Sequence, residues 1–260
     1  MALTLLICGH QASGKSTLRR VLDTHPQVTV LADFGAFRSV GGSRRAYVQG
    51  LRLQRRYLER HQPLSAGFCA RFLTRLAWRT GRRGPVEFEE VDRALQGLLP
   101  ESRVIGDVAN GYLEVAAREA GRPNVRTIVV YRDCRDVAAT IQERFDGRWR
   151  HLLDDPSRRE FVQQIDTPEK IARRWAALVD ESTQLRGEVL PVHYEQLVTE
   201  PAVVLTGIGQ WLGVRANGFD SSWLRSDEVG RYRDVLDTEQ IETVEAVAGG
   251  AMRQLGYDVR

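Results

Sequence analysis

The stretch LTLLICGHQASGKSTLRRVL, residues 3–22, contains the strongest indication of the fold of this chain. It opens with an apolar run, and its last part spaces Leu18, Val21 and Leu22 as one face of a helix does. Between them, residues 9–16 fit the pattern G-x4-G-K-[ST], which requires a strand before it and a helix after it. We therefore expect a buried strand, a tight loop and a helix, in that order.

The loop at residues 9–16 has the chemistry of a phosphate-binding loop. Its glycines let backbone N–H groups converge on an anion, and the N-terminus of the following helix adds partial positive charge. Lys15 supplies a point charge for the bridging oxygen of a departing group. We predict that the ligand is bound by Gly9, His10, Gln11, Ala12, Ser13, Gly14, Lys15, Ser16 and Thr17.

Strands and helices alternate beyond this stretch, which favours a parallel α/β sheet in three layers. Apolar segments predict further strands at 28–31, 103–107, 125–131 and 188–193. Spacing and helix start and stop signals predict helices at about 44–99, 136–145, 171–185, 200–212 and 237–255. Residues 146–165 are expected to form a loop or a short helix. One domain over residues 1–260 is the simplest organisation, with residues 38–100 as an Arg-rich helical insertion on the acceptor side of the site.

The composition is that of a soluble globular protein. Hydrophobic residues make up 42% and charged residues 27% of the 260, which excludes a collagen-like or disordered chain. No apolar run approaches the roughly 18 residues that cross a bilayer. Residues 1–9 lack the basic leader and cleavage site of a signal peptide, and the three cysteines form no CxxC pair. These features predict a cytoplasmic protein with reduced thiols.

Positive charge is concentrated in one stretch. The net charge is +3, but 12 arginines and one acid between Arg38 and Arg83 give that stretch +11, which leaves −8 for the rest. Within it, an apolar face and a basic ridge lie side by side at helical spacing: Phe68, Phe72 and Leu76, and Arg71, Arg75 and Arg79.

A basic amphipathic helix can lie on an anionic membrane, so residues 38–83 are a candidate for peripheral membrane contact. The alternatives are a solvated arginine face over an ordinary core contact, a site for an anionic or lipid-linked acceptor, and a surface for a partner protein. No nucleic-acid motif accompanies the arginines, and we expect no nucleic-acid partner.

A second anion site is indicated by the segment RDCRDVAAT, residues 132–140, which follows the strand predicted at 125–131. A basic residue at the end of a parallel strand, with a hydroxyl eight positions later, can clamp a phosphate. The alternative is an ordinary structural pairing of Arg132. A user of ATP would also need an acid for Mg²⁺. Asp107 ends a short strand interrupted by Gly106, and Asp133 lies beyond its strand, so we predict no metal site.

These segments together resemble the sulfotransferases that use 3′-phosphoadenosine-5′-phosphosulfate (PAPS). Residues 9–18 have the length and place of the family's G-x-P-R-S-G-T-T-x-L loop, and residues 132–140 resemble R-D-P-R-D-V-x-x-S. Further similarities cover 106–112 (G-D before an aromatic), 192–201 (R-Y-E-D-L-V-x-x-P), 208–213 (F-L-G) and 229–233 (V-G-R-W-R). The chain departs from the family at Ala12, where Arg is usual, at Lys15, where Thr is usual, and at Val108, where Lys is usual.

The resemblance implies in-line transfer of SO₃ from PAPS to a hydroxyl or amine, with adenosine 3′,5′-bisphosphate (PAP) leaving. It implies that the loop and Lys15 stabilise the charge that builds on the leaving group. It also implies that Arg132 and Thr140 hold the 3′-phosphate while Arg231, Tyr232 and Arg233 close over it. The expected acceptor is a small molecule, a carbohydrate or a lipid, and the reaction requires no metal.

The acceptor needs a general base within hydrogen-bond reach. Asp33 follows the second strand and resembles the acid in the E-F-G-x-F segment of some family members, although an Asp there is also a common turn former. His151, in the loop after the 3′-phosphate helix, is the second candidate. His10 is expected to position a substrate or to be exposed, and His193 to be structural.

Two other functions stay open at this point. A small-molecule kinase that uses ATP and Mg²⁺ is favoured by the intact G-x4-G-K-S pattern and by Asp107. A nucleotide-binding scaffold at the membrane, without catalysis, is favoured by Ala12, Val108 and the cationic insertion.

Overall fold

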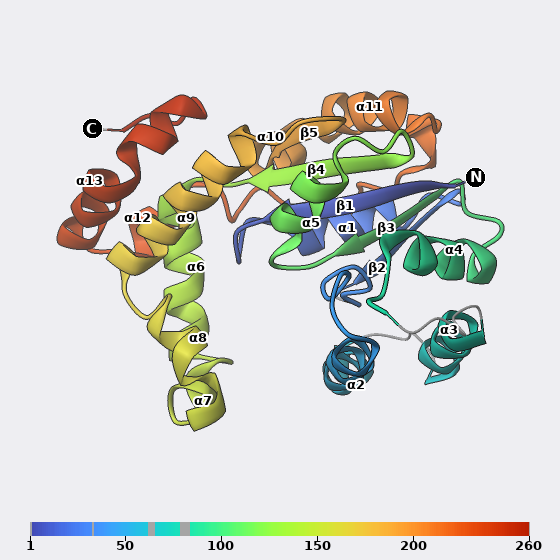
Figure 1. The fold of residues 1–260 in the computed structure, drawn as a ribbon. Helices are drawn as coiled ribbons and strands as arrows, with labels where there is room; N and C mark the ends of the chain where they lie inside the picture. Colours follow the sequence, from blue (N-terminus) through green and yellow to red (C-terminus); the bar gives the residue numbers. More distant parts are fainter. Residues whose placement is uncertain (1, 33, 62–65, 79–83, 260) are drawn as a thin grey trace.

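Five parallel strands form one sheet at the centre of the structure, a computed structural model that describes residues 2–32, 34–61, 66–78 and 84–259 (Figure 1). The strands are β1 (Leu3–Gly9), β2 (Val28–Ala32), β3 (Val104–Val108), β4 (Val125–Tyr131) and β5 (Val189–His193), in the order β2-β3-β1-β4-β5. All four neighbouring pairs are parallel. The predicted parallel α/β sheet is confirmed.

The order of the strands brings both predicted anion sites to one edge of the sheet. β1 and β4 are neighbours, with Gly9 in register with Val130. The loop that leaves β1 and the segment that leaves β4 therefore start side by side, at the carboxyl ends where ligands of such sheets bind.

Helices account for most of the remaining chain. The long ones are α1 (Lys15–Leu22), α2 (Arg44–His61), α3 (Ala66–Trp78), α4 (Phe88–Leu98), α5 (Tyr112–Glu119), α6 (Cys134–Asp146), α9 (Pro168–Thr183), α11 (Pro201–Leu212) and α13 (Thr238–Gln254). The short ones are α7 (Arg150–Leu153), α8 (Arg159–Gln163), α10 (Tyr194–Thr199) and α12 (Tyr232–Val235).

Each face of the sheet is covered by its own apolar cluster, which gives the three layers that the sequence predicts. On one face, β-strand residues pack with apolar side chains of α1, α10 and α11. On the other face, they pack with α5, α6, α9, α13 and the helices α2–α4. The alternating side chains of fully buried parallel strands feed both clusters.

The helical insertion consists of α2, α3 and α4, between β2 and β3 in the chain. The apolar stripe of α3 belongs to the core, because Phe68, Phe72 and Leu76 are all buried. Phe72 packs edge-on against Phe34, with ring centroids 5.3 Å apart. Arg71 and Arg75 are exposed, whereas Arg79 lies outside the described residues.

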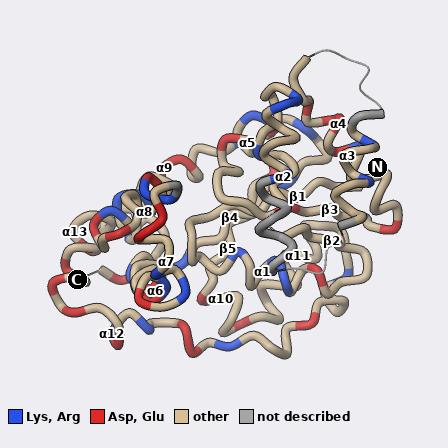
Figure 2. The backbone as a smooth tube through the Cα atoms, turned by 90° about the horizontal axis from the view of Figure 1, so that it is seen from below, with Lys and Arg blue, Asp and Glu red and all other residues tan. Residues whose placement is uncertain are grey.

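α2–α4 and α6–α8 lie at opposite ends of the molecule in the view of Figure 1. Basic and acidic segments alternate along α8 and α9 in Figure 2, so these helices present mixed charge to solvent. In the part of the chain that the structure describes, no helix combines the length and the apolar character needed to cross a bilayer.

Candidate active site

The loop between β1 and α1 turns at two glycines that its backbone requires. Gly9 has a φ of 141° and Gly14 a φ of 91°, values that favour glycine. A Cβ on Gly14 would lie 2.2 Å from Cδ2 of Tyr194, and a Cβ on Gly9 would lie 2.5 Å from the carbonyl oxygen of Val130. The loop therefore packs directly against β4 and α10.

Lys15, the first residue of α1, turns its ammonium group back across this loop. Its Nζ donates hydrogen bonds to the carbonyl oxygens of Gly9, at 2.8 Å, and His10, at 2.5 Å. Gly14 occupies the cap position of α1 and no side chain caps the helix, so its N-terminus presents partial positive charge to an anion. The loop thus combines a cation and a helix N-terminus.

His10 is neutral and fixed in one tautomer. Its Nδ1 lies 2.8 Å from the carbonyl oxygen of Gln11, and because a carbonyl only accepts, Nδ1 carries the proton and Nε2 the lone pair. Burial lowers the pKa of His10 to about 3. The ring is 3% exposed, so the alternative of an exposed His10 is wrong.

Three polar atoms of the loop are buried without a hydrogen-bond partner in the described part of the chain. They are Nε2 of His10, Oε1 of Gln11 and Oγ of Ser13. Buried polar groups are nearly always satisfied in folded proteins, so such a cluster indicates groups that a ligand satisfies.

Arg132 connects this loop to the second predicted anion site. Its Nη1 donates to the carbonyl oxygen of Ala12 and to Oγ1 of Thr140, both at 3.2 Å. Its Nη2 donates to the carbonyl oxygen of Glu228 at 2.7 Å, and its guanidinium lies 4.7 Å over the ring of Tyr194. The structure therefore brings Arg132 and Thr140 together, and one guanidinium group reaches both anion sites.

The segment 228–233 lies over the first turn of α6. Asp136 accepts hydrogen bonds from the backbone N–H groups of Gly230, at 2.8 Å, and Tyr232, at 2.9 Å. The guanidinium of Arg233 lies 4.6 Å over the ring of Tyr232. Asp136 thus fixes this segment beside Arg132.

Arg231 is held at the rim of the same site by two acids. It pairs with Glu143 of α6 at 2.6 Å and with Glu228 at 3.3 Å. The Glu228 carboxylate is also 3.8 Å from Nη2 of Arg132. Glu228 was not predicted from the sequence, because a carboxylate beside an anion site has no motif that would identify it.

Asp107 is buried within β3, and it holds the segment that follows β2. Its Oδ2 accepts hydrogen bonds from the N–H of Ala36, at 2.8 Å, and the hydroxyl of Tyr112, at 2.7 Å. The hydroxyl oxygen of Tyr112 accepts from the N–H of Phe37 at 3.2 Å. This carboxylate therefore positions the backbone at residues 36–37, which differs from the Mg²⁺ role that the kinase alternative assigned to it.

The two predicted general bases have different outcomes. Asp33 lies outside the described residues. His151 is exposed on α7, which follows the far end of α6 in Figure 1. The 13 residues of α6 span about 20 Å at 1.5 Å per residue. The structure therefore does not bring His151 to the loop at residues 9–16.

Tyr194 is a site residue whose role was not predicted, although it lies in the segment 192–201 that resembles the family. Its ring lies against Gly14 of the loop and beneath the guanidinium of Arg132, so it contacts both anion sites. Its position directly after β5, at the carboxyl edge of the sheet, was the signal available in the sequence.

The residues present fit a ligand with two separate anionic groups. The N-terminus of α1 and Lys15 suit one group, and Arg132 with Thr140 suits the other. Nε of Arg132 is buried with no partner among the residues described, as is Oγ of Ser13, so each of the two sites keeps a polar atom for a ligand.

Comparison with protein families gives one match. A family model described as "Sulfotransferase family" matches residues 5–218. The matched range contains the loop, Arg132 and Thr140, and it ends before the segment 228–233. A search of curated protein sequences gives no match.

Three solved structures with similar folds cover the whole chain. The sulfotransferase domain from the curacin biosynthetic pathway has a TM-score of 0.67 at 15% identity, with 99% of that chain covered. The sulfotransferase domain of the Synechococcus PCC 7002 olefin synthase has a TM-score of 0.64 at 17% identity, with 96% covered. A sulfotransferase from Alicyclobacillus acidocaldarius has a TM-score of 0.55 at 17% identity, with 98% covered. At these identities the likeness shows a shared fold.

Proposed function

Because this chain belongs to the sulfotransferase family, we propose that it transfers the sulfonate group of PAPS to a hydroxyl or amine of an acceptor. The reaction class, sulfonyl transfer, follows from the family. The proposed acceptor is a small molecule, a carbohydrate or a lipid. PAPS supplies the sulfonate group and carries two anionic groups, its 5′-phosphosulfate and its 3′-phosphate, which match the two anion sites in number and charge.

The loop at residues 9–17 is proposed to hold the 5′-phosphosulfate. The N–H groups at the start of α1 and the ammonium of Lys15 stabilise the negative charge that develops on the leaving phosphate. Ser16 and Thr17 are proposed to donate further hydrogen bonds there. Because these donors are already fixed by the fold, little reorganisation is needed during the transfer.

Arg132 and Thr140 are proposed to hold the 3′-phosphate, with Arg231, Tyr232 and Arg233 closing over it. The observation that carries this proposal is the pair of 3.2 Å hydrogen bonds from one nitrogen of Arg132 to Ala12 and Thr140. A guanidinium group in this position can contact a 3′-phosphate while it supports the loop that holds the 5′ end.

Asp33 is proposed as the general base that removes the proton of the sulfonate acceptor. In the sequence it precedes residues 34–37, and the backbone N–H groups of Ala36 and Phe37 are held by Asp107 and Tyr112. Nε2 of His10 carries a lone pair that can accept a hydrogen bond from the O–H or N–H group of the sulfonate acceptor. It cannot donate a hydrogen bond to a phosphate oxygen.

The Arg132→Ala variant tests the assignment of the 3′-phosphate site. Its binding of PAP should weaken by about 1.5–3 kcal/mol, the range for hydrogen bonds to charged groups. Binding of adenosine 5′-monophosphate, which lacks the 3′-phosphate, should change little. Calorimetric titration of both nucleotides measures the difference.

Arg173→Ala is the matched control, because it removes an arginine whose side chain is 71% exposed on α9. It should leave both affinities unchanged. If Arg132→Ala weakened both nucleotides to the same extent, Arg132 would not be the residue that recognises the 3′-phosphate.

A further inference from the structure

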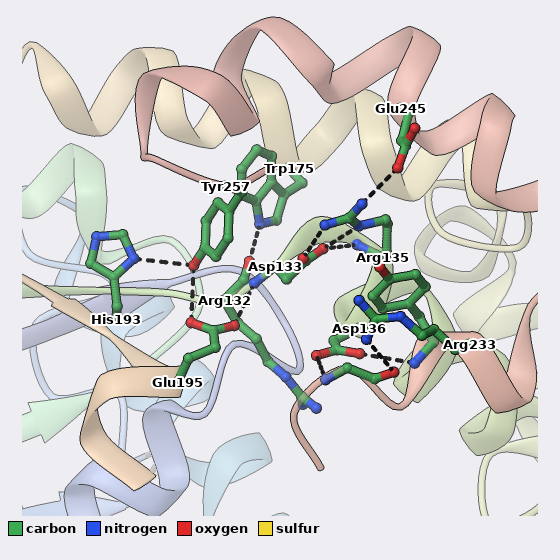
Figure 3. Close-up of polar contacts among 12 residues, drawn as sticks. Arg132, Asp133, Arg135, Asp136, Trp175, His193, Glu195, Arg233, Glu245 and Tyr257 are labelled. Atoms are coloured by element: carbon green, nitrogen blue, oxygen red, sulfur yellow. Dashed lines mark hydrogen bonds and ion pairs between the residues drawn. The ribbon is translucent and has the colours of Figure 1, made fainter. Parts of the chain in front are cut away.

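The peptide group between Arg132 and Asp133 is held at both of its polar ends by side chains from other elements (Figure 3). Its carbonyl oxygen accepts a hydrogen bond from Nε1 of Trp175, on α9, at 3.0 Å. Its N–H donates to Oε1 of Glu195, on α10, at 2.8 Å. The one acceptor and the one donor of this peptide group are therefore bound by side chains of α9 and α10, which fixes its orientation.

Glu195 is in turn held by the C-terminal end of the chain. Its second oxygen, Oε2, accepts a hydrogen bond from the hydroxyl of Tyr257 at 3.1 Å. The same hydroxyl lies 3.2 Å from Nδ1 of His193. Because the single proton of Tyr257 is donated to Glu195, His193 donates through Nδ1. Burial raises the pKa of the Tyr257 hydroxyl, which therefore remains a donor at neutral pH.

A second contact ties the same turn to the C-terminal helix. Asp133 accepts hydrogen bonds from Nε of Arg135, at 3.0 Å, and from its Nη2, at 2.6 Å. Nη1 of Arg135 pairs with Glu245 of α13 at 2.6 Å. Residues 245 and 257 thus hold the Arg132 turn from two directions, and both lie beyond the range of the family match.

We propose that Glu195 and Tyr257 are positioning residues for recognition of the 3′-phosphate: they fix the Arg132–Asp133 peptide group and so aim the Arg132 side chain. This inference rests on the proposed function, since it assigns the 3′-phosphate to Arg132. Its consequence is that the preference for a 3′-phosphorylated nucleotide depends on Tyr257, which lies 125 positions from Arg132 in the sequence.

The Tyr257→Phe variant tests the inference with little disturbance, because it keeps the ring that packs near Trp175 and His193. It removes the hydroxyl that holds Glu195. Affinity for PAP should fall about fivefold, the net worth of one hydrogen bond, while affinity for adenosine 5′-monophosphate stays the same. Both are measured by calorimetric titration.

A double-mutant cycle separates positioning from a general loss of stability. In the Arg132→Ala background, Tyr257→Phe should have no further effect on the affinity for PAP, because the side chain that it positions is absent. If the fivefold loss of affinity for PAP persisted in that background, or if Tyr257→Phe weakened binding of both nucleotides equally, Tyr257 would not act through Arg132.

Tyr47→Phe is the matched control, since Tyr47 also donates a buried hydroxyl hydrogen bond, to the carbonyl oxygen of Ala36 at 2.6 Å. It should not change the preference for PAP. Glu195→Ala should reduce the preference for PAP at least as much as Tyr257→Phe does. Glu195→Gln, which keeps an oxygen for the N–H of Asp133, should restore most of it.

The wild-type protein shows which proposal fails. If it bound PAP and adenosine 5′-monophosphate equally, the proposed 3′-phosphate site would be overturned, and this inference with it. If the wild type preferred PAP and Tyr257→Phe kept that preference in full, only the positioning role would be overturned.

Discussion

At the scale of the residue, His10 shows how burial determines chemical state within the loop. The unfolded chain binds a proton at His10 near pH 6.5, whereas the folded protein does so only near pH 3. Between these values the unfolded state holds more protons, so the free energy of unfolding falls as the pH falls. We expect the titration of His10 to lower the free energy of unfolding by about 2 kcal/mol between pH 7 and pH 5.

The His10→Asn variant should remove that dependence, because Asn keeps an N–H donor for the carbonyl of Gln11 and does not titrate. Urea unfolding at pH 7 and pH 5, for the wild type and the variant, measures the difference. Burial also lowers the pKa of His193. Because His193 is present in both proteins, its contribution cancels when their pH dependences are compared. Equal pH dependence in the two proteins would show that His10 is not buried as a neutral ring.

Single residues also show what the sequence could predict about the site. The pair Arg132 and Thr140 was predictable because both belong to one strand–helix unit and lie eight positions apart. Glu228 and Tyr257 were not predictable as partners, since their contacts to Arg132 and Glu195 span 96 and 62 positions. Only the folded chain brings such distant residues together.

At the scale of the element, α3 distinguishes a core helix from a membrane-surface helix. Its apolar stripe is buried, and the ring of Phe72 is fully buried against Phe34. Phe72→Ala should therefore lower the free energy of unfolding by about 3–5 kcal/mol, the usual cost of removing a core phenylalanine. Arg71→Gln, on the exposed side, should change it by less than about 0.5 kcal/mol.

Urea unfolding of both variants decides between the two descriptions of α3. If Phe72→Ala were as harmless as Arg71→Gln, the apolar stripe would not be part of the core and would be available to a membrane or a partner. The predicted amphipathic pattern is correct in either case, because periodicity identifies an apolar face but does not identify what covers it.

The elements also differ in how well their bounds could be predicted. β4 has the predicted bounds, Val125 and Tyr131, because its β-branched residues and the final tyrosine form a nearly continuous run. The helix after it begins at Cys134, two positions earlier than predicted, because Asp133 caps it by accepting the N–H of Arg135. The helix α5 was not predicted; it follows Gly111, whose φ of 86° allows the chain to turn directly from β3 into a helix of eight residues.

At the scale of the whole molecule, the proposed site joins four segments that are distant in the sequence. The loop after β1, the turn after β4, the start of α10 and the segment 228–233 meet around Arg132. The sheet order was needed to see this, because it makes β1 and β4 neighbours although their carboxyl ends, Gly9 and Tyr131, lie 122 positions apart in the sequence.

Calorimetric titration of the protein with PAP, beside ATP with Mg²⁺, distinguishes the proposed function from both alternatives. We predict that PAP binds with a dissociation constant in the micromolar range or lower and that ATP binds weakly, since only PAP presents a 3′-phosphate to Arg132. Tight, Mg²⁺-dependent binding of ATP with no heat from PAP would contradict it and favour the kinase alternative, and no heat from either nucleotide would contradict it in favour of a scaffold.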